Sequence, residues 1–170
     1  MPNIVPVLIL VDGEEIVKAV GRGGSLAHPK PLYNIQNKCI YMIANDAFVG
    51  NYNKTSELLL QVKPQDMIQW RVSAIARDVY SPIMVKYESS NENALESPFQ
   101  AIVRQTYFIQ QNAHKPDGLV QQEVKLDVEL MASVLEKDQE LAYHMVIKLV
   151  DHEGETVGYY VWDPYIRTGE

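Results

Sequence analysis

Hydrophobic and polar residues alternate along much of the chain with a period of two. This is the pattern of β-strands that bury one face. The clearest case is residues 120–130, where Val and Leu alternate with charged residues, and residues 67–75 and 99–110 show the same alternation. These three segments are predicted to be strands.

Shorter apolar segments predict further strands at residues 4–11, 39–44, 57–62, 83–87, 141–150 and 156–162. Residues 4–11 are almost continuously apolar, so we expect this strand to be buried on both faces or to lie at a contact between two sheets. Pro6 favours an edge position or a bulge, because proline cannot donate to a sheet ladder. About eight or nine strands at regular spacing predict an all-β fold, an antiparallel β-sandwich.

The last of these strands carries the most distinctive sequence, Gly158-Tyr-Tyr-Val-Trp162. Aromatic and β-branched residues favour strands, and Pro164 is predicted to end this one. Because large rings occupy both faces, we expect the strand to lie inside a sheet.

At most one short helix is expected, at residues 14–20, with Asp12 as its N-cap and Glu15 at the capping-box spacing. The alternative for this segment is a second short strand. The long segment 21–38 and the polar segment 45–56 are predicted to be loops.

The composition of the chain limits the classes of protein to which it can belong. A chain of 170 residues, 46% hydrophobic, is predicted to form a single domain spanning residues 1–170. The net charge of −7 argues against nucleic acid as a partner. The N-terminus lacks a basic region and no segment has membrane-spanning length, so we expect a cytoplasmic protein without a membrane partner. Export by a leaderless route stays open.

No catalytic constellation stands out, so an enzyme is not expected. Cys39 begins an apolar segment and is predicted to be a buried, inert thiol rather than a nucleophile paired with a histidine. We interpret the acidic residues Asp12, Glu14 and Glu15 as the cap and first turn of a helix, with calcium binding as the alternative. The histidines show no metal-ligand spacing, so no metal or other cofactor is predicted.

One candidate ligand site emerges from the polar loop 45–56. Sugars are held by amide and carboxylate hydrogen bonds together with an aromatic ring. The predicted ligand-binding residues are Asn45, Asp46, Asn51, Tyr52 and Asn53. The alternative is an ordinary solvated loop.

Three blocks of sequence carry a family resemblance. They are residues 3–12, the central blocks 67–73, 82–87 and 98–100, and the closing residues 158–166. With these blocks in this order, the chain resembles the AidA/PixA-type bacterial inclusion body proteins. The resemblance implies a β-sandwich from a host-associated bacterium, made under quorum or growth-phase control and in some cases collected as cytoplasmic inclusions. It implies no catalytic residues.

We therefore expect a non-catalytic inclusion-body-type protein that associates with itself as a homo-oligomer, for which exposed sheet edges give a physical route. The alternative is a carbohydrate-binding, lectin-like module that uses the Asn- and Tyr-rich loops to bind a glycan. A content of 6 Met in 170 residues does not support a sulfur store.

Overall fold

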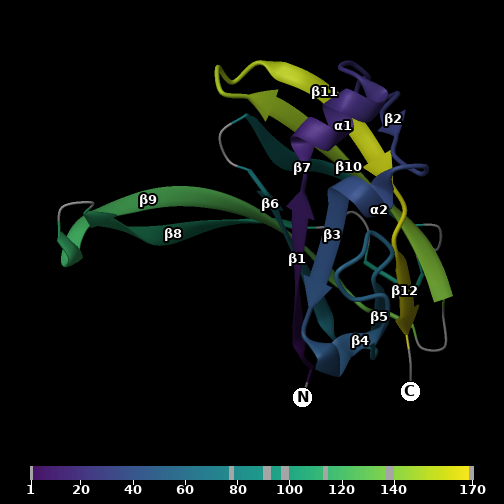
Figure 1. Cartoon of the computed structure of the whole chain (residues 1–170). Helices are drawn as coiled ribbons and strands as arrows, with labels where there is room; N and C mark the ends of the chain where they lie inside the picture. Colours follow the sequence, from purple (N-terminus) through teal and green to yellow (C-terminus); the bar gives the residue numbers. More distant parts are fainter. Residues whose placement is uncertain are drawn as a thin grey trace.

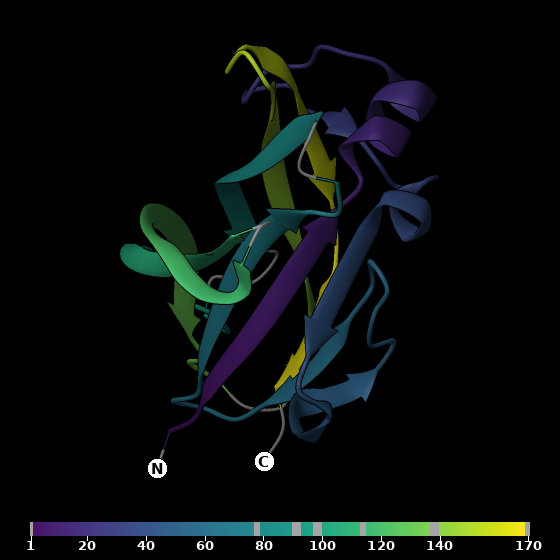
Figure 2. The same cartoon turned by 60° about the vertical axis from the view of Figure 1, so that its left-hand side comes forward.

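The protein is seen in a computed structural model that describes residues 2–76, 79–89, 93–96, 100–112, 115–136 and 140–168. For residues 88, 100–112, 115–128, 141 and 168 only the backbone is described. Two mixed β-sheets lie face to face, and α1 lies at one end of them (Figures 1 and 2).

The first sheet has five strands in the order β3-β1-β6-β9-β8. In chain order these are β1 (Ile4–Val11), β3 (Ile40–Ala44), β6 (Met67–Ala74), β8 (Gln100–Asn112) and β9 (Lys115–Ser133). β1 is an interior strand, antiparallel to β3 and parallel to β6. The N-terminal strand therefore organises this sheet.

The second sheet has seven strands in the order β2-β11-β10-β12-β5-β4, with β7 paired to β10 as well. These strands are β2 (Lys30–Pro31), β4 (Val49–Asn51), β5 (Leu59–Val62), β7 (Tyr80–Ser89), β10 (Glu140–Asp151), β11 (Thr156–Trp162) and β12 (Tyr165–Thr168). Both β11 and β12 pair with β10, and Asp163 and Pro164 separate these two strands along the chain. The backbone stays beside β10 across this break, because the Tyr143 N–H donates to the Pro164 carbonyl at 3.0 Å.

The prediction that the closing strand lies inside a sheet is confirmed. β11 lies between β2 and β10, and the Tyr160 and Trp162 side chains are fully buried. The Tyr160 hydroxyl donates to the Gly21 carbonyl at 3.0 Å, which ties the strand to the end of α1. Pro164 follows the strand, as predicted.

The predicted helix is also confirmed as α1 (Gly13–Val20), with Asp12 as its N-cap accepting from the Glu15 N–H at 3.0 Å. The expectation of at most one helix was wrong. A one-turn helix, α2 (Gln36–Cys39), and a 3₁₀ turn, η1 (Asp46–Phe48), lie in segments predicted to be loops. Cys39 is consequently the last residue of α2, and the strand after it begins at Ile40.

The strand-rich prediction is confirmed, but the antiparallel topology was wrong. Three strand pairs are parallel, namely β1 with β6, β2 with β11 and β5 with β12. The structure describes twelve strands rather than eight or nine. The extra strands β2, β4 and β12 have two to four residues each, too few to show a period of two.

β1 lies at the contact between the sheets and buries one face only. Val5, Val7, Ile9 and Val11 are buried, whereas Ile4 and Leu8 on the other face are 57% and 36% exposed. Pro6 sits in a central strand, yet the pairing of β1 with β3 begins only at Val7. The missing N–H of Pro6 is therefore tolerated where the strand has one neighbour.

The core between the sheets is one cluster of buried side chains from both. It contains a group of three aromatic rings. The rings of Trp70, Tyr87 and Tyr143 lie 5.5–6.1 Å apart in tilted pairs. The Trp70 indole N–H donates to the Tyr143 hydroxyl at 3.2 Å, which joins β6 of one sheet to β10 of the other.

β8 and β9 form a two-stranded ribbon that extends away from the two sheets (Figure 1). β9 pairs with β6 only over Leu130–Ser133, but with β8 from Lys115 to Met131. Within the described part of the chain, residues 115–129 of β9 pair with β8 alone.

Candidate functional site

The predicted ligand-binding residues lie on the loop between β3 and β5, and their amides hold the loop itself. The Asn45 Oδ1 accepts from the Ala47 N–H at 3.0 Å and caps η1. The Asn53 Nδ2 donates to the Ala44 carbonyl at 3.1 Å and to Asp46 Oδ1 at 2.9 Å. Together with Asn51, which accepts from the Tyr52 N–H, four of the five predicted residues thus make side-chain hydrogen bonds that give this loop its shape.

Tyr52 differs from these residues in its backbone conformation. Its φ of +57° lies in the left-handed region, which bulky residues rarely adopt. The Asn51 Oδ1 accepts from the Tyr52 N–H at 2.9 Å, and the Thr55 hydroxyl donates to the Tyr52 carbonyl at 2.8 Å. These contacts fix the backbone, and the Tyr52 side chain is 56% exposed.

The Tyr52 ring borders a hollow on the outer face of the second sheet. The strand register aligns Asn51, Leu59, Tyr165 and Ala142 in a row across β4, β5, β12 and β10. Leu60 and Ile166, the next residues along two of these strands, are fully buried, so Leu59 and Tyr165 lie on the opposite face. The hollow has a volume of about 210 Å³ and is lined by Tyr52, Glu57, Leu59, Glu140 and Tyr165.

Two carboxylates give the hollow a negative character, and each is held by a partner. The Gln36 Nε2 donates to Glu57 Oε1 at 3.2 Å, and the Arg167 Nε donates to Glu140 Oε2 at 3.0 Å. A third carboxylate, Asp163, lies within electrostatic range of Glu57. Burial raises the pKa of Asp163 above its ordinary value, His144 opposes this, and Glu57 adds to it.

Of the predicted ligand-binding residues, the structure brings Tyr52 to the hollow. Glu57, Glu140 and Tyr165 were missed because they lie on or beside strands far apart in the sequence. No periodic signal marks them, since short strands that pair in parallel cannot be read from alternation. Sugar binding at the loop stays a prediction.

Other candidate chemistry has a structural explanation. The Cys39 side chain is fully buried, as predicted. Burial is the main cause that raises the pKa of its thiol to about 12, and the carboxylates of Asp12 and Glu15 add to the increase. Of the four histidines, in which no metal-ligand spacing was found, His114 lies outside the described residues. In the described part of the chain, no three metal-ligating side chains gather as a metal site, and no helix is long and apolar enough to cross a membrane.

The comparisons with known proteins agree on one family. The family model described as "PixA: Inclusion body protein" matches residues 3–168. Among solved structures, the chain is similar to an inclusion body protein (PixA) from Burkholderia cenocepacia J2315. The identity is 12%, the match covers 99% of this chain and 97% of that one, and the TM-score is 0.76. At this identity the structural match shows the fold alone.

A second solved structure, the solution structure of Amebosin, is 6% identical, covers 72% of this chain and 92% of that one, and has a TM-score of only 0.30, so it carries no argument. The search of curated proteins finds no match. The family model spans nearly the whole chain, which defines the class as inclusion body proteins. The chain belongs to the PixA inclusion body protein family.

Proposed function

We propose that this chain is a non-catalytic inclusion body protein that associates with itself and collects in the cytoplasm of a host-associated bacterium. Membership of the PixA family supports the inclusion-body part of the proposal. Its production under quorum or growth-phase control belongs to the same proposal. The main structural support for self-association is an apolar strip on the outer face of β1.

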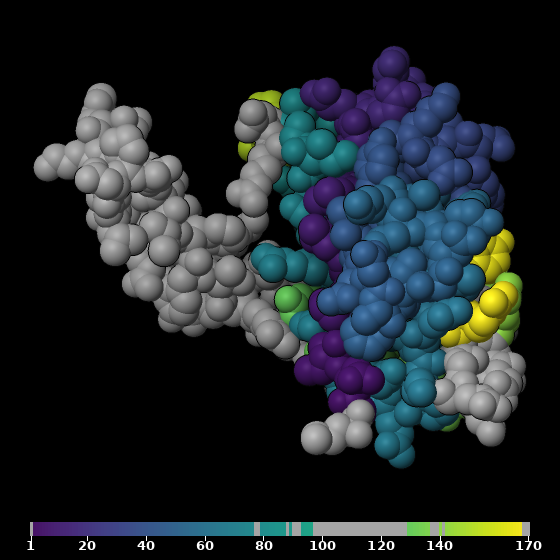
Figure 3. Space-filling model, turned by 60° about the horizontal axis from the view of Figure 1, so that its bottom comes forward, coloured from purple at the N-terminus to yellow at the C-terminus, as the bar shows by residue number. Residues whose placement is uncertain are grey.

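The strip is formed by Ile4, Pro6 and Leu8, which are all exposed. In the register, Ile4 lies beside Met67 of β6, and Leu8 lies between Ile43 of β3 and Arg71 of β6, all partly exposed. Atoms of β1 reach the surface beside those of β3 and β4, as the purple and blue atoms of Figure 3 show. A contiguous apolar strip on a sheet is typical of an interaction surface.

The β8–β9 ribbon adds a second, backbone-level argument. β8 pairs with β9 from Gln100 to Asn112, whereas β9 pairs with β6 only over Leu130–Ser133. A two-stranded ribbon by itself is marginally stable in water, so a ribbon that extends from its sheet favours association with a second surface.

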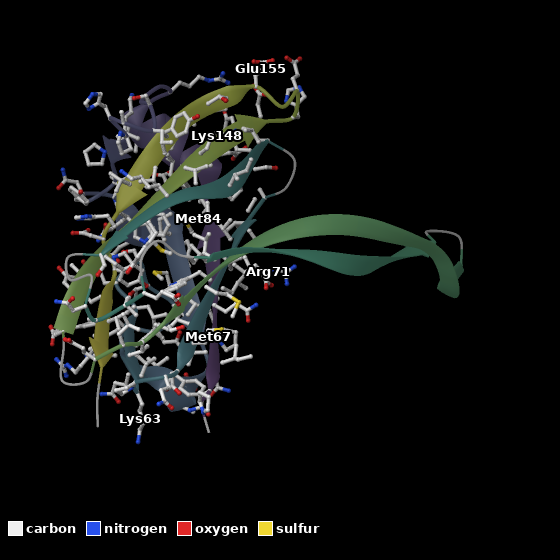
Figure 4. The ribbon with its side chains drawn as sticks, turned by 180° about the vertical axis from the view of Figure 1, so that it is seen from behind. Lys63, Met67, Arg71, Met84, Lys148 and Glu155 are labelled. Carbon is white, nitrogen blue, oxygen red and sulfur yellow. The ribbon has the colours of Figure 1, made fainter. Side chains whose placement is uncertain are left out.

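The ribbon and the strip belong to the same sheet. β6, which carries the ribbon through β9, also flanks β1, and Figure 4 shows Arg71 of β6 where the ribbon leaves the sheet. Two copies could therefore bury the ribbon of one on the outer face of β1 in the other. An exchange of this kind would be isologous, with the same patch used on both copies.

The test is a double variant, Ile4→Thr with Leu8→Thr, because threonine keeps the strand preference and removes apolar area. Burial of a leucine or isoleucine stabilises an interface by roughly 1.5–3 kcal/mol. We expect the double variant to associate at least about tenfold more weakly than the unmodified chain in sedimentation equilibrium.

Leu26→Thr is the matched control, since Leu26 is 45% exposed but lies in the loop beside β2, at the second sheet. It should associate like the unmodified chain. Thermal unfolding of both variants checks that each is folded. An unchanged association constant for the folded double variant would count against the proposed surface.

A further inference from the structure

We propose that the hollow lined by Tyr52, Glu57, Leu59, Glu140 and Tyr165 binds a small organic ammonium cation, such as a quaternary ammonium group. The proposal stands apart from self-association. The hollow is on the outer face of β4, β5, β12 and β10, whereas the apolar strip belongs to the other sheet.

The size of the hollow sets the class of ligand. Its volume of about 210 Å³ is far more than the roughly 10–15 Å³ that one water requires. It is less than the roughly 300–1,000 Å³ of sites for drug-sized ligands. A single substituted ammonium group is of suitable size.

The two tyrosines supply aromatic faces from different elements. Tyr52 comes from the loop after β4, and Tyr165 opens β12. Tyr165 is 39% exposed, so part of its side chain is available to a ligand. In Figure 3 the blue atoms of the loop and the yellow atoms of the C-terminal strand lie near each other. Substituted ammonium groups bind to aromatic faces through the ring quadrupole.

The charges around the hollow favour a cation over an anion or a neutral ligand. The lining contains two carboxylates and no lysine or arginine. Glu140 is paired with Arg167, but Glu57 has no ion pair within the described residues. One carboxylate is therefore left to neutralise a bound cation, within a chain whose net charge is −7.

The site is also preorganised. Gln36 is only 4% exposed and donates to Glu57, so the carboxylate is anchored from inside the molecule. Tyr52 is held in its left-handed conformation by hydrogen bonds from its own loop. Groups that are fixed before binding lose little conformational entropy when a ligand arrives.

The experiment is isothermal titration of the purified chain with choline, and with 3,3-dimethylbutan-1-ol as the uncharged molecule of the same shape. We expect choline to bind and the alcohol to bind at least about tenfold more weakly, because only choline offers a charge to Glu57 and the rings. Choline binding should weaken as sodium chloride is raised.

Variants assign the binding to the hollow. Glu57→Gln should weaken choline binding by roughly fivefold, as expected for the loss of a partly exposed charge. Tyr52→Asn should weaken it by about threefold, because asparagine accepts the left-handed backbone but has no ring. Tyr52→Phe keeps the ring and should retain binding.

The matched control is Glu155→Gln, which removes a carboxylate at the β10–β11 hairpin, at the end of the molecule opposite Lys63 in Figure 4. It should bind choline like the unmodified chain. Equal binding of choline and the neutral alcohol would overturn the proposal. So would no choline binding at millimolar concentrations, an effect of Glu155→Gln as large as that of Glu57→Gln, or binding of uncharged methyl glycosides in place of choline.

Discussion

Several polar residues that resemble ligands have local structural roles. Asp12 caps α1, and Asp66, buried at the start of β6, accepts from the Asn3 N–H at 2.8 Å and the Lys63 N–H at 3.0 Å. Asn53 similarly braces its own loop. The cap of α1 could be predicted because its partner is three residues away. The bond from Asp66 to Asn3 could not, because it spans 63 positions.

The thiol of Cys39 gives a prediction at the residue scale. Its pKa of about 12 leaves almost no thiolate near pH 8, and its Sγ lies 3.4 Å from the Ile35 carbonyl. We expect iodoacetamide to modify the folded chain roughly a thousandfold more slowly than free cysteine at the same pH.

The control for this measurement is the same chain unfolded in urea, in which Cys39 should react at the rate of a free thiol. Reaction of the folded chain at that rate would contradict both the burial and the raised pKa of the thiol.

At the scale of elements, the sequence predicted long strands well and short ones poorly. β6 and β10 follow clear alternation, but β2, β4 and β12 are defined by their neighbours rather than by their own residues. Apolar composition alone also did not settle whether β1 buries one face or two. That depends on what covers the sheet, which is a tertiary property.

Gly158 of β11 gives a prediction at this scale, because its backbone lies directly against Gly23. A Cβ at position 158 would meet the Gly23 carbonyl oxygen, and would lie 2.7 Å from the Tyr160 hydroxyl. The Gly23 N–H also donates to the Val157 carbonyl at 2.9 Å, so this backbone has little freedom to shift. Gly158→Ala should reduce the free energy of unfolding by about 1–3 kcal/mol in urea denaturation.

Gly50→Ala is the comparison. A Cβ there would lie 2.9 Å from the Gln61 side chain, which is exposed and can move aside. This variant should lose clearly less stability than Gly158→Ala. Equal losses would show that the close approach of β11 to Gly23 is not what requires glycine.

At the scale of the whole molecule, the strand-rich class and the family could be recognised from sequence, but the sheet order could not. β1 and β6 are parallel neighbours separated by 55 residues that build part of the other sheet. No local pattern encodes such a pairing. The hollow has the same origin, because its lining meets only when β12 lies beside β5.

The same topology leaves β1 as an interior strand with Ile4 and Leu8 exposed, while the ribbon of β8 and β9 extends from the other side of that sheet. An apolar strip on one sheet and a projecting ribbon are the two features on which the proposed self-association rests. In that proposal the surface of the first sheet joins copies of the chain.

The most direct test of this account is sedimentation velocity of the unmodified chain over a wide range of protein concentrations. The account predicts that the weight-average mass rises with concentration above the 19.3 kDa of one chain. A single species of 19.3 kDa at every concentration, up to the millimolar range, would contradict self-association and with it the proposed function.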